Sequence, residues 1–384
     1  MKLAYDMQRL SSNLLFTSFD QFQTGLLWSS QRLTDMETYE RLWLNDATTR
    51  LPDIKTRFNV YRTTTEFWES GLWGRAPRNM SEDVAKVFEQ ASVWRSMKGN
   101  GIVLVDADNR IRAVDPSDWH PVYDEADADS VVGHIVTYFY NAHRAADSSE
   151  QPDRVDVLMI PSDGGGTRQT FTFEGQSVGT PASEPMQMAV KRIAWWGDGV
   201  SDYVDAKPIV DELEARYSAL ARVLDQHSDP HLQGPESALD ADGVFRPAEG
   251  SNFLPLPDTE SPEFAYVTYD GKQEAQLDAI NQLFDQLQIT TKIPATAFGL
   301  STDAQQSGVS RERLLFAAIQ KLRRLRREMT GPVMDISAEL GSGMESVEWP
   351  NHPFSSWGEL AETLAICVKE GIYSAEQARE MLEF

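Results

Sequence analysis

Apolar side chains recur at intervals of three and four residues in a stretch between Lys272 and Ile289. They are Leu277, Ile280, Phe284 and Leu287. This spacing places them on one face and predicts an amphipathic helix. Lys292-Ile293-Pro294 should end it, because the residue before a proline is pushed out of the helical conformation.

A second helix is predicted after a loop of small and polar residues at 295–308, and either Ser307 or Ser310 suits its N-cap. Its apolar stripe consists of Leu314, Leu315, Ala318, Leu322, Leu325 and Met329. Its other side is basic and carries Arg313, Arg323, Arg324 and Arg327, flanked by Lys321 and Arg326. Such a face is typical either of a solvated helix with salt bridges or of a contact with another molecule.

The first hundred residues are expected to be helical. A polar helical region with Tyr39, Leu42 and Leu44 precedes Pro52, and another helix runs from Phe58 past Glu69 until glycines at 71 and 74 stop it. Ser81 is expected to cap a third helix that ends at Lys98-Gly99, where glycine suits the position after a helix. The side chains predicted to face inward from this third helix are Val84, Val87, Phe88, Ala91 and Trp94.

The pattern then changes to that of strands. The segments 101–106 and 111–114 flank a short turn and predict a hairpin, and 115–119 is expected to be a turn. Further strands are predicted at 131–140, 155–160, 169–173 and 188–195, with Gly164-Gly165-Gly166 in a hairpin turn. Residues 100–196 are therefore expected to form a mainly antiparallel β region between helical parts.

A long helix is predicted at 206–226, with an apolar face of Ile209, Leu213, Tyr217, Leu220 and Leu224. Residues 228–270 are rich in Pro, Gly, Asp and Ser, and a structureless loop of that length is improbable within a compact domain. Strand patterns at 252–256 and 264–268 indicate a small α/β excursion between two antiparallel helices. Near the end, Leu360, Leu364 and Val368 predict a helix, and Ser374 with Gln377 forms a capping-box pair for a last one.

Composition narrows the class of protein. The chain has 384 residues, a formal net charge of −24 and a single cysteine, Cys367. The acidic balance argues against a surface that grips phosphates throughout, so the basic face at 311–327 is a local reversal of sign. One cysteine allows no internal disulfide, and no apolar run is long enough to span a membrane. The first residues lack the apolar core of a signal peptide.

A search for catalytic and cofactor motifs finds none, so no cofactor and no enzymatic activity are expected. The chain has no phosphate-binding P-loop sequence and no zinc-protease His-Glu-x-x-His. His227 and His231 are separated by a helix-breaking proline, which disfavours a shared metal. Acidic clusters at Asp124, Glu125, Asp127, Asp129 and at Asp240, Asp242 are interpreted as solvated loops rather than calcium sites. Cys367 is interpreted as a packed side chain, and Trp195-Trp196 as core rings in preference to base-stacking ones.

The order of elements resembles the portal proteins of tailed bacteriophages. The resemblance is carried by residues 39–77, which close on Leu72-Trp73-Gly74-Arg75-Ala76-Pro77, and by Lys98-Gly99-Asn100-Gly101 leading into a valine-rich strand and then Val114-Asp115-Pro116. Gly199-Val200-Ser201-Asp202 before a long helix also matches. The strongest match runs from Lys292-Ile293-Pro294 through Phe298-Gly299 and Ser307-Gly308 into the long basic helix.

The resemblance implies an α+β fold with named parts. Residues 1–200 would form a wing containing the β region, and 201–227 and 271–292 would form two stem helices. Residues 228–270 would form an α/β clip, 293–308 a tunnel loop, and 309–384 a wing helix and C-terminal helices. The long C-terminal helical crown of the family would be short or absent, because only about 40 residues follow Gly341.

The resemblance also implies a function and partners. The chain would form a ring of twelve copies at one vertex of the capsid, through which double-stranded DNA is packaged and ejected. Its partners would be the terminase large subunit, head-completion or adaptor proteins, and the major capsid or scaffolding protein, with no membrane. It would be assembled in the host cytoplasm and reside in the virion.

The implied DNA-facing residues of the tunnel loop are Lys292, Thr296, Ser301, Thr302, Gln305, Gln306, Ser307 and Arg311. The basic face formed by Arg313, Arg323, Arg324 and Arg327 could contact DNA or the acidic surface of the next subunit. The second reading is favoured slightly, because many bases facing DNA would hold it. Two alternatives stay open: an acidic hydrolase with unrecognised paired carboxylates, and another structural or connector protein of a virion.

Overall fold

The structure is a computed structural model, and it is a mixed α/β protein of α+β type. The residues that it describes are 30–49, 51, 54, 57–123, 127, 130–140, 154–161, 167–174, 177–178, 182–185, 190–227, 231–239, 253–257, 264–267, 273–298, 308–350, 365–369 and 374–377. The chain divides into two compact units. The first comprises residues 1–49, 59–205 and 291–384, and the second comprises residues 50–58 and 206–290.

The helices of the first unit begin with α3 (Ser30–Trp43), α4 (Val60–Trp73) and α5 (Glu82–Lys98). The predicted caps of α5 are confirmed: the Ser81 hydroxyl accepts a hydrogen bond from the Val84 amide, and Gly99 ends the helix in the left-handed region. Phe88 and Ala91 are fully buried as predicted, whereas Val84, Val87 and Trp94 are partly buried. Helix α4 was predicted to stop at glycines 71 and 74. It continues past Gly71 to Trp73, and Gly74 follows it as the cap, which confirms the second of the two positions.

Two sheets complete the first unit. The smaller has the order β2-β1-β9 and consists of β1 (Gly101–Asp106), β2 (Ile111–Ala113) and β9 (Val190–Trp196), all antiparallel. The larger contains β3 (Trp119–Tyr123), β4 (Val131–Tyr140), β5 (Arg154–Pro161) and β6 (Thr167–Glu174) in that order. Both β7 (Ser177–Val178) and β8 (Ala182–Pro185) pair with β6.

The antiparallel β region predicted at 100–196 is confirmed, but three strands within it were not anticipated. The expected turn at 115–119 is the short helix η2 (Pro116–Asp118), and Trp119 already belongs to β3. Strand β3 was missed because Pro121 interrupts its pattern, and β7 and β8 because they are only two and four residues long.

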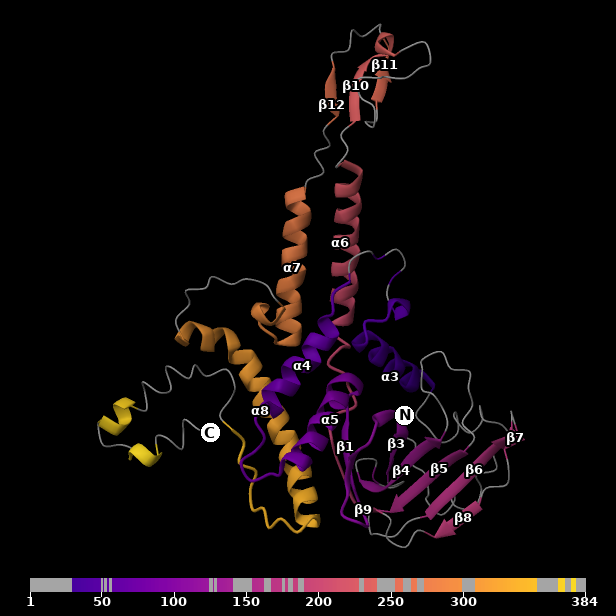
Figure 1. The fold of residues 1–384 in the computed structure, drawn as a ribbon, viewed down its shortest axis with the longest axis vertical. Coiled ribbons are helices and arrows are strands. Elements are labelled where there is room, and N and C mark those ends of the chain that lie inside the picture. The colour runs from indigo at the N-terminus through magenta and orange to yellow at the C-terminus, as the bar shows by residue number, and fades with distance from the viewer. Residues whose placement is uncertain are drawn as a thin grey trace. The chain divides into compact units, whose positions relative to one another are not determined.

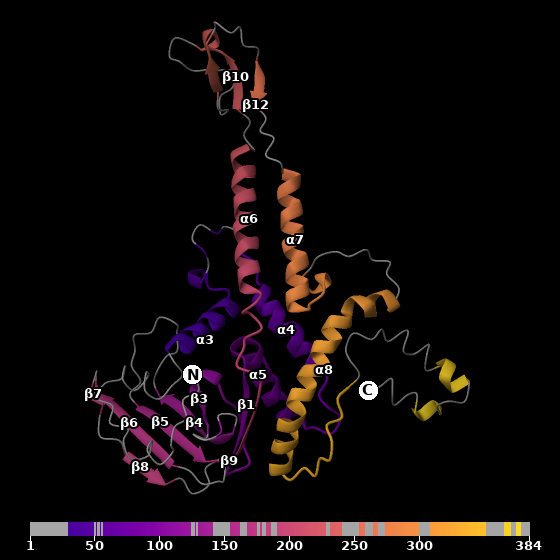
Figure 2. The same ribbon diagram turned by 180° about the vertical axis from the view of Figure 1, so that it is seen from behind.

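The three-stranded sheet is covered on both faces (Figures 1 and 2). On one face Val103, Val105, Ala194 and Trp196 pack in a cluster with α4, α5 and α8 (Gly308–Glu339). On the other face Ile102, Leu104 and Ile193 pack against Trp119 and other residues of the six-stranded sheet. This sandwich explains why β1 is apolar at five consecutive positions instead of alternating, since a strand with both faces buried has no polar side.

Three glycines allow two backbone segments to touch in the first unit. Gly99 has φ of 88° and Gly197 has φ of 108°, conformations that L side chains rarely adopt. A Cβ on Gly99 would lie 2.3 Å from the carbonyl carbon of Gly199, and one on Gly197 would lie 2.3 Å from the carbonyl oxygen of Gly99. The Gly199 amide donates to that same oxygen over 3.1 Å. The end of α5 is thereby joined to the turn that follows β9.

The second unit contains α6 (Lys207–His227) and α7 (Gln273–Thr291), which lie side by side and antiparallel (Figures 1 and 2). Both helices are confirmed within two residues of their predicted bounds. Tyr217 and Phe284 meet edge-on with ring centroids 6.3 Å apart, and Phe58 packs on both rings at 5.0 and 5.9 Å. Leu213, Leu220, Ile280, Phe284 and Leu287 are buried as expected, but Leu224 and Leu277 are about half exposed.

Between α6 and α7 in the chain lies a three-stranded sheet of β10 (His231–Pro235), β11 (Phe253–Leu256) and β12 (Ala265–Val267). Strand β10 is central and pairs with β11 in parallel and with β12 in antiparallel orientation. The two outer strands were predicted, whereas β10, which begins at His231 directly after Pro230, was not.

Helix α8 runs for 32 residues and continues across Pro332. Beyond it the described residues include two short helical stretches, 365–369 and 375–377. The predicted capping box is confirmed, since the Ser374 amide donates to the Gln377 side chain over 2.9 Å and the Gln377 amide donates to the Ser374 hydroxyl over 3.1 Å.

A pair of carboxyl groups joins α4 to α5 within the first unit. Burial raises the pKa of Glu69 to about 7. A hydrogen bond that the protonated Glu69 donates to Glu89 and the negative charges of Glu89 and Glu66 raise it further. The folded state holds the proton of Glu69 more tightly than the unfolded chain does. The stability that this proton contributes is therefore fully present below about pH 4.5 and is lost as the pH rises to about 7.

Glu69→Gln should therefore raise the free energy of unfolding above pH 7 by about 1 kcal/mol, less than the full shift implies because solvent screens a half-exposed group. Urea unfolding at pH 5 and pH 8 would measure it. The variant should gain at pH 8 and change little at pH 5, whereas Glu82→Gln, which removes an exposed acid from α5, should show no such pH dependence. An equal change at both pH values would contradict the shared proton.

Candidate functional site

The segment that leads from α7 into the predicted tunnel loop is anchored at its start. Lys292 is exposed and has φ of 61°, so α7 ends in a left-handed residue without a glycine. Ile293 is 1% exposed, and its amide donates to the Thr291 hydroxyl over 3.3 Å. The short helix η6 (Ala295–Phe298) follows, with Ala297 and Phe298 packed on the core of the first unit. Lys292 is thus held at the surface by the buried residue next to it.

The remaining loop residues are described only in part. Ser301, Thr302, Gln305, Gln306 and Ser307 lie outside the described residues. Thr296 lies in η6 and Arg311 and Arg313 lie in the first turns of α8, but their side chains are also outside the description. Helix α8 begins at Gly308, directly after Ser307, which agrees with the first of the two predicted starts.

The apolar stripe of α8 anchors the basic helix. Ala318, Leu322, Leu325 and Met329 are buried as predicted, and Leu315 is partly buried. The stripe continues beyond the predicted part through Val333 and Ile336, which are both fully buried. Each such side chain stabilises the packing by about 1.5–3 kcal/mol, so the orientation of the polar side of α8 is set by this face.

Three predicted arginines lie on the exposed side of α8. Arg323, Arg324 and Arg327 are exposed, and Arg324 forms an ion pair with Glu328 one turn later at 3.1 Å. In the part of the chain that the structure describes, Arg323 and Arg327 have no hydrogen bond or ion pair. These two guanidinium groups are therefore the exposed cations of the predicted basic face that have no partner among the described residues.

Lys321 is not part of that exposed face, contrary to the sequence-based expectation that it flanks it. Its side chain is 10% exposed and reaches inward, where its ammonium group donates to Asp202 over 3.0 Å. The same group lies 4.4 Å from the centroid of the Trp68 ring, a cation–π distance. The apolar stem of lysine lets it cross the packed layer while its charge finds a partner.

Asp202 is the centre of a buried cluster of charges that includes Lys321 and two residues of α5. Its carboxylate accepts hydrogen bonds from Arg95 at 3.1 Å, Lys321 at 3.0 Å and the Ser96 hydroxyl at 2.9 Å. Burial alone would raise the pKa of Asp202, but Lys321 and Arg95 outweigh it and hold that pKa below its usual value. Arg95 also contacts Glu328 at 3.4 Å, which links the cluster to the exposed ion pair of α8.

The cluster extends to α4 through Tyr203, whose hydroxyl shares a 2.5 Å hydrogen bond with Thr65. Burial raises the pKa of the Tyr203 phenol, which therefore stays protonated. Three helices and the turn after β9 consequently meet at one set of polar contacts. The sequence offered one signal for it, namely a charged residue inside an otherwise regular apolar pattern, at Arg95 and at Lys321.

Arg326 also departs from the expected basic face. One of its nitrogens donates to the Pro350 carbonyl over 2.6 Å, and its guanidinium lies 5.5 Å from the centroid of the Trp349 ring. Burial lowers its pKa to about 10, so it remains charged at neutral pH. Arg326 therefore holds the chain after α8 against the helix instead of facing a partner.

The other sequence candidates fall into packing roles where they are described. Trp196 is buried and stacks on Phe88 at 5.5 Å, and Trp195 lies 5.5 Å from Trp119, which confirms that both rings pack in the core. Cys367 is unpaired and partly buried. Asp124, Glu125, Asp129, Asp240 and Asp242 lie outside the described residues, whereas Asp127 is described.

Neither metal-binding groups nor membrane spans are found among the described residues. No three histidine, cysteine or acidic side chains come together there as a metal site would require. Within the same ranges, none of the helices combines the length and apolar character needed to cross a bilayer.

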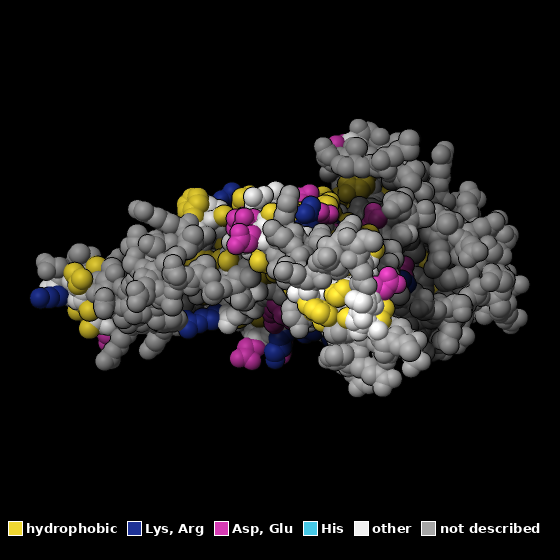
Figure 3. Space-filling view, turned by 90° about the horizontal axis from the view of Figure 1, so that it is seen from above, with side chains coloured by type: hydrophobic (Ala, Val, Ile, Leu, Met, Phe, Trp, Pro, Cys, Tyr) yellow, Lys and Arg dark blue, Asp and Glu magenta, His cyan; other side chains and the backbone are white. Residues whose placement is uncertain are grey.

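On the face seen in Figure 3, the described acidic and basic side chains are scattered among other residues. A search against models of known protein families finds no match, and no curated protein matches the chain. The proposed function therefore rests on the geometry of α8 and of the segment before it.

Asp202→Asn should lower the free energy of unfolding by about 3–5 kcal/mol, because it leaves Arg95 and Lys321 buried without their common counter-charge. Arg324→Gln, which removes an exposed pair on the same helix, should change it by no more than about 0.5 kcal/mol. Urea unfolding followed by tryptophan fluorescence would compare the two. A loss below about 1 kcal/mol for Asp202→Asn would show that the cluster is not needed for stability.

Proposed function

We propose that this chain is the subunit of a portal-type ring, located at one vertex of a bacteriophage capsid, through which double-stranded DNA passes. The observation that carries the proposal is the order of elements from α6 to α8. Two antiparallel helices enclose a small three-stranded sheet in the chain, and the second helix leads through Lys292 and η6 into a long helix with a basic face. The stem, clip, tunnel-loop and wing-helix segments of a portal have this order.

The helical hairpin is suited to the wall of a channel. Helix α6 has 21 residues and α7 has 19, so each is about 30 Å long. Both helices leave large apolar side chains exposed, namely Leu224 on α6 and Leu277 and Ile289 on α7, with exposures of 48, 46 and 77%. Apolar side chains left uncovered on a two-helix pair favour burial against neighbouring copies, and a ring requires such repeated contacts that close.

The charge distribution fits a conduit better than a DNA-gripping protein. A net charge of −24 repels phosphates over most of the surface, which favours sliding over binding. Arg323 and Arg327, exposed and without a described partner, suit the acidic surface of a neighbouring subunit. Lys292, held outward at the start of the loop, suits transient contact with phosphates.

The proposal assigns the energy of packaging to a separate motor, the terminase ATPase, since the chain carries no nucleotide-binding motif. The other partners would be head-completion or adaptor proteins and a capsid or scaffolding protein. A different virion connector would share the ring but not the order of elements from α6 to α8.

One observation favours the alternative function, that of a hydrolase with paired carboxylates. Glu69 and Glu89 share a proton near neutral pH, as acid–base pairs do. However, they lie between α4 and α5, and neither lines the cavity beside β9 that is described below. Because the pair bridges α4 and α5 and does not line this cavity, we interpret it as a contact between helices.

Replacing Arg323, Arg324 and Arg327 together by glutamine should weaken ring assembly, because it removes the charges proposed to pair with the next subunit. Mass photometry and negative-stain imaging at several salt concentrations would measure the fraction of rings. A matched control replaces Arg62, Arg110 and Arg112, which are also exposed and lie outside α6, α7 and α8. Equal assembly of the two variants would remove the basic face from the interface, and a chain that stays monomeric under all conditions would count against the ring itself.

Replacing residues 299–307 by a Gly-Ser linker of equal length should leave ring formation intact and reduce DNA packaging or retention, because it changes the proposed lining and spares the packed residues Ala297 and Phe298. Nuclease-protected DNA per particle would measure packaging. Loss of the folded subunit, seen by circular dichroism, would show instead that this segment belongs to the core.

A further inference from the structure

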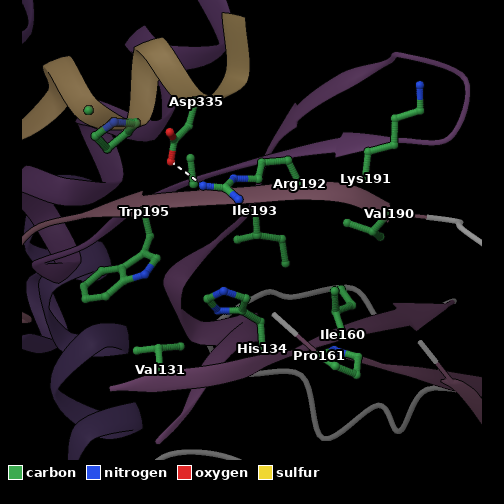
Figure 4. A pocket seen from close by; sticks show the side chains of 13 residues that line it. Val131, His134, Ile160, Pro161, Val190, Lys191, Arg192, Ile193, Trp195 and Asp335 are labelled. Carbon is green, nitrogen blue, oxygen red and sulfur yellow. Dashed lines mark hydrogen bonds and ion pairs between the residues drawn. The ribbon is translucent and has the colours of Figure 1, made fainter. Parts of the chain in front are cut away.

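A cavity of about 390 Å³ lies beside strand β9 in the first unit (Figure 4). Six consecutive residues of β9, from Val190 to Trp195, line it. Among the described strands β9 pairs only with β1 and is therefore the edge of the three-stranded sheet. The remaining lining comes from β4 and its neighbourhood, from the end of β5, and from α8.

The cavity lies against the hydrogen-bonding edge of β9. Successive side chains of a strand point to opposite faces: Ile193 packs toward the six-stranded sheet, while Arg192 reaches Asp335 of α8. A cavity lined by both kinds of residue must face the edge between them. Its floor is the six-stranded sheet, with Val131 and Ile160, and its roof is α8, with Gly331 and Pro332.

The volume of the cavity can be compared with that of a short extended segment. Neighbouring strands lie about 4.8 Å apart, layers about 10 Å apart, and each residue advances about 3.3 Å, so one residue of an added strand occupies about 160 Å³. The cavity therefore holds about two to three residues in extended conformation. We call it the β9 slot.

The floor of the slot is apolar except for one hydrogen-bond donor, the imidazole N–H of His134. His134 is 8% exposed, and its Nδ1 accepts a hydrogen bond from the Trp119 indole over 3.3 Å. Burial and the charge of Arg192 lower the pKa of His134 to about 4, so the ring is neutral at pH 7 and carries its proton on Nε2. That N–H has no partner among the described residues, and Figure 4 shows the ring standing between Val131, Ile193 and Ile160.

The roof of the slot is polar, and the space beneath it is open. Arg192 and Asp335 form an ion pair of 2.6 Å at the slot, and both side chains are about half exposed. A Cβ built on Gly331 meets no atom within 4 Å. Because both side chains of the pair are open to solvent, an incoming carboxylate that approaches Arg192 would compete with Asp335 for it.

We propose that the β9 slot binds an extended peptide segment of a partner protein, which adds a strand to β9 and alternates apolar and acidic residues. The apolar side chains would face Val131, Ile160 and Ile193, and the acidic one would face Arg192. Main-chain hydrogen bonds to β9 supply affinity in this mode of recognition, and the alternating pockets supply specificity. His134 donates to an acceptor of the segment on the floor.

This inference is independent of the proposed ring, because the slot is built within one subunit from β9, the six-stranded sheet and α8. A monomeric chain would keep the slot, and a ring with the slot filled would remain a ring.

The probe is a fluorescein-labelled heptapeptide, Ser-Thr-Val-Glu-Val-Thr-Ser, with its binding to the purified full chain followed by fluorescence polarisation. Saturable binding below 1 mM is expected. Replacing the glutamate of the peptide by lysine should weaken binding at least tenfold, and replacing its second valine by proline should abolish it, because proline lacks the amide that the ladder needs.

Two variants of the protein locate the site. Gly331→Leu should abolish binding by filling the roof while sparing the fold, since a glycine inside a helix tolerates a side chain. Ala338→Leu, at an exposed position on the same helix, should bind like the unaltered chain. Asp335→Asn should tighten binding severalfold, because it frees Arg192 for the peptide carboxylate.

Absence of saturable binding by the heptapeptide would overturn the proposal, and so would equal affinity of the Gly331→Leu variant. Self-association of the unaltered chain that disappears in Gly331→Leu would also overturn it, in favour of a second copy as the occupant.

Discussion

Asp202 carries a negative charge into the interior, and the arrangement of α4, α5 and α8 depends on how that charge is neutralised. Arg95 comes from α5, Lys321 comes from α8, and Tyr203 next to Asp202 reaches Thr65 of α4. Removing ions from water costs several kcal/mol each, which is recovered only when geometry and additional hydrogen bonds are good. Apolar side chains could pack the same helices in several registers, whereas this cluster is satisfied in one. It therefore contributes more to the uniqueness of the arrangement than to its total stability.

Contacts inside the first unit also engage some of the cations of α8. Lys321 and Arg326 are engaged inside the unit, and Arg324 is shared with Glu328, which also contacts Arg95. The set of cations that remains on the exposed side of α8 is therefore smaller than the sequence indicates. A smaller set of outward charges favours a directed contact, such as one acidic strip on a neighbour, over the broad attraction that a polyanion would require.

The sequence predicts the helices and strands whose hydrophobic periodicity is long and regular. It does not predict those whose formation depends on contacts with residues distant in the chain. Helices α5, α6 and α7, the capping residues Ser81, Gly99 and Ser374, and the longer strands follow from local pattern. Strands β3, β7, β8 and β10 are short or contain proline and glycine, so their pairing is set by neighbours distant in the chain. Within the candidate site, the buried stripe of α8 was predictable, but the inward course of Lys321 was not, because helical position alone does not show where a long flexible side chain places its charge. The slot beside β9 arises from three segments and had no sequence signal.

The close approach of Gly99 to Gly197 and Gly199 also bears on how relatives of this chain could be found. Surface positions such as Glu82 can change freely, and apolar core positions tolerate one another's residues, so overall similarity fades with divergence. A side chain at 99 or 197 is excluded by the backbone opposite it, whatever else has changed. Lys98-Gly99-Asn100-Gly101, followed about a hundred residues later by Gly197-Asp198-Gly199-Val200-Ser201-Asp202, is consequently a two-part signature. A search with that spaced pattern would identify distant relatives through the glycine contact that they must preserve.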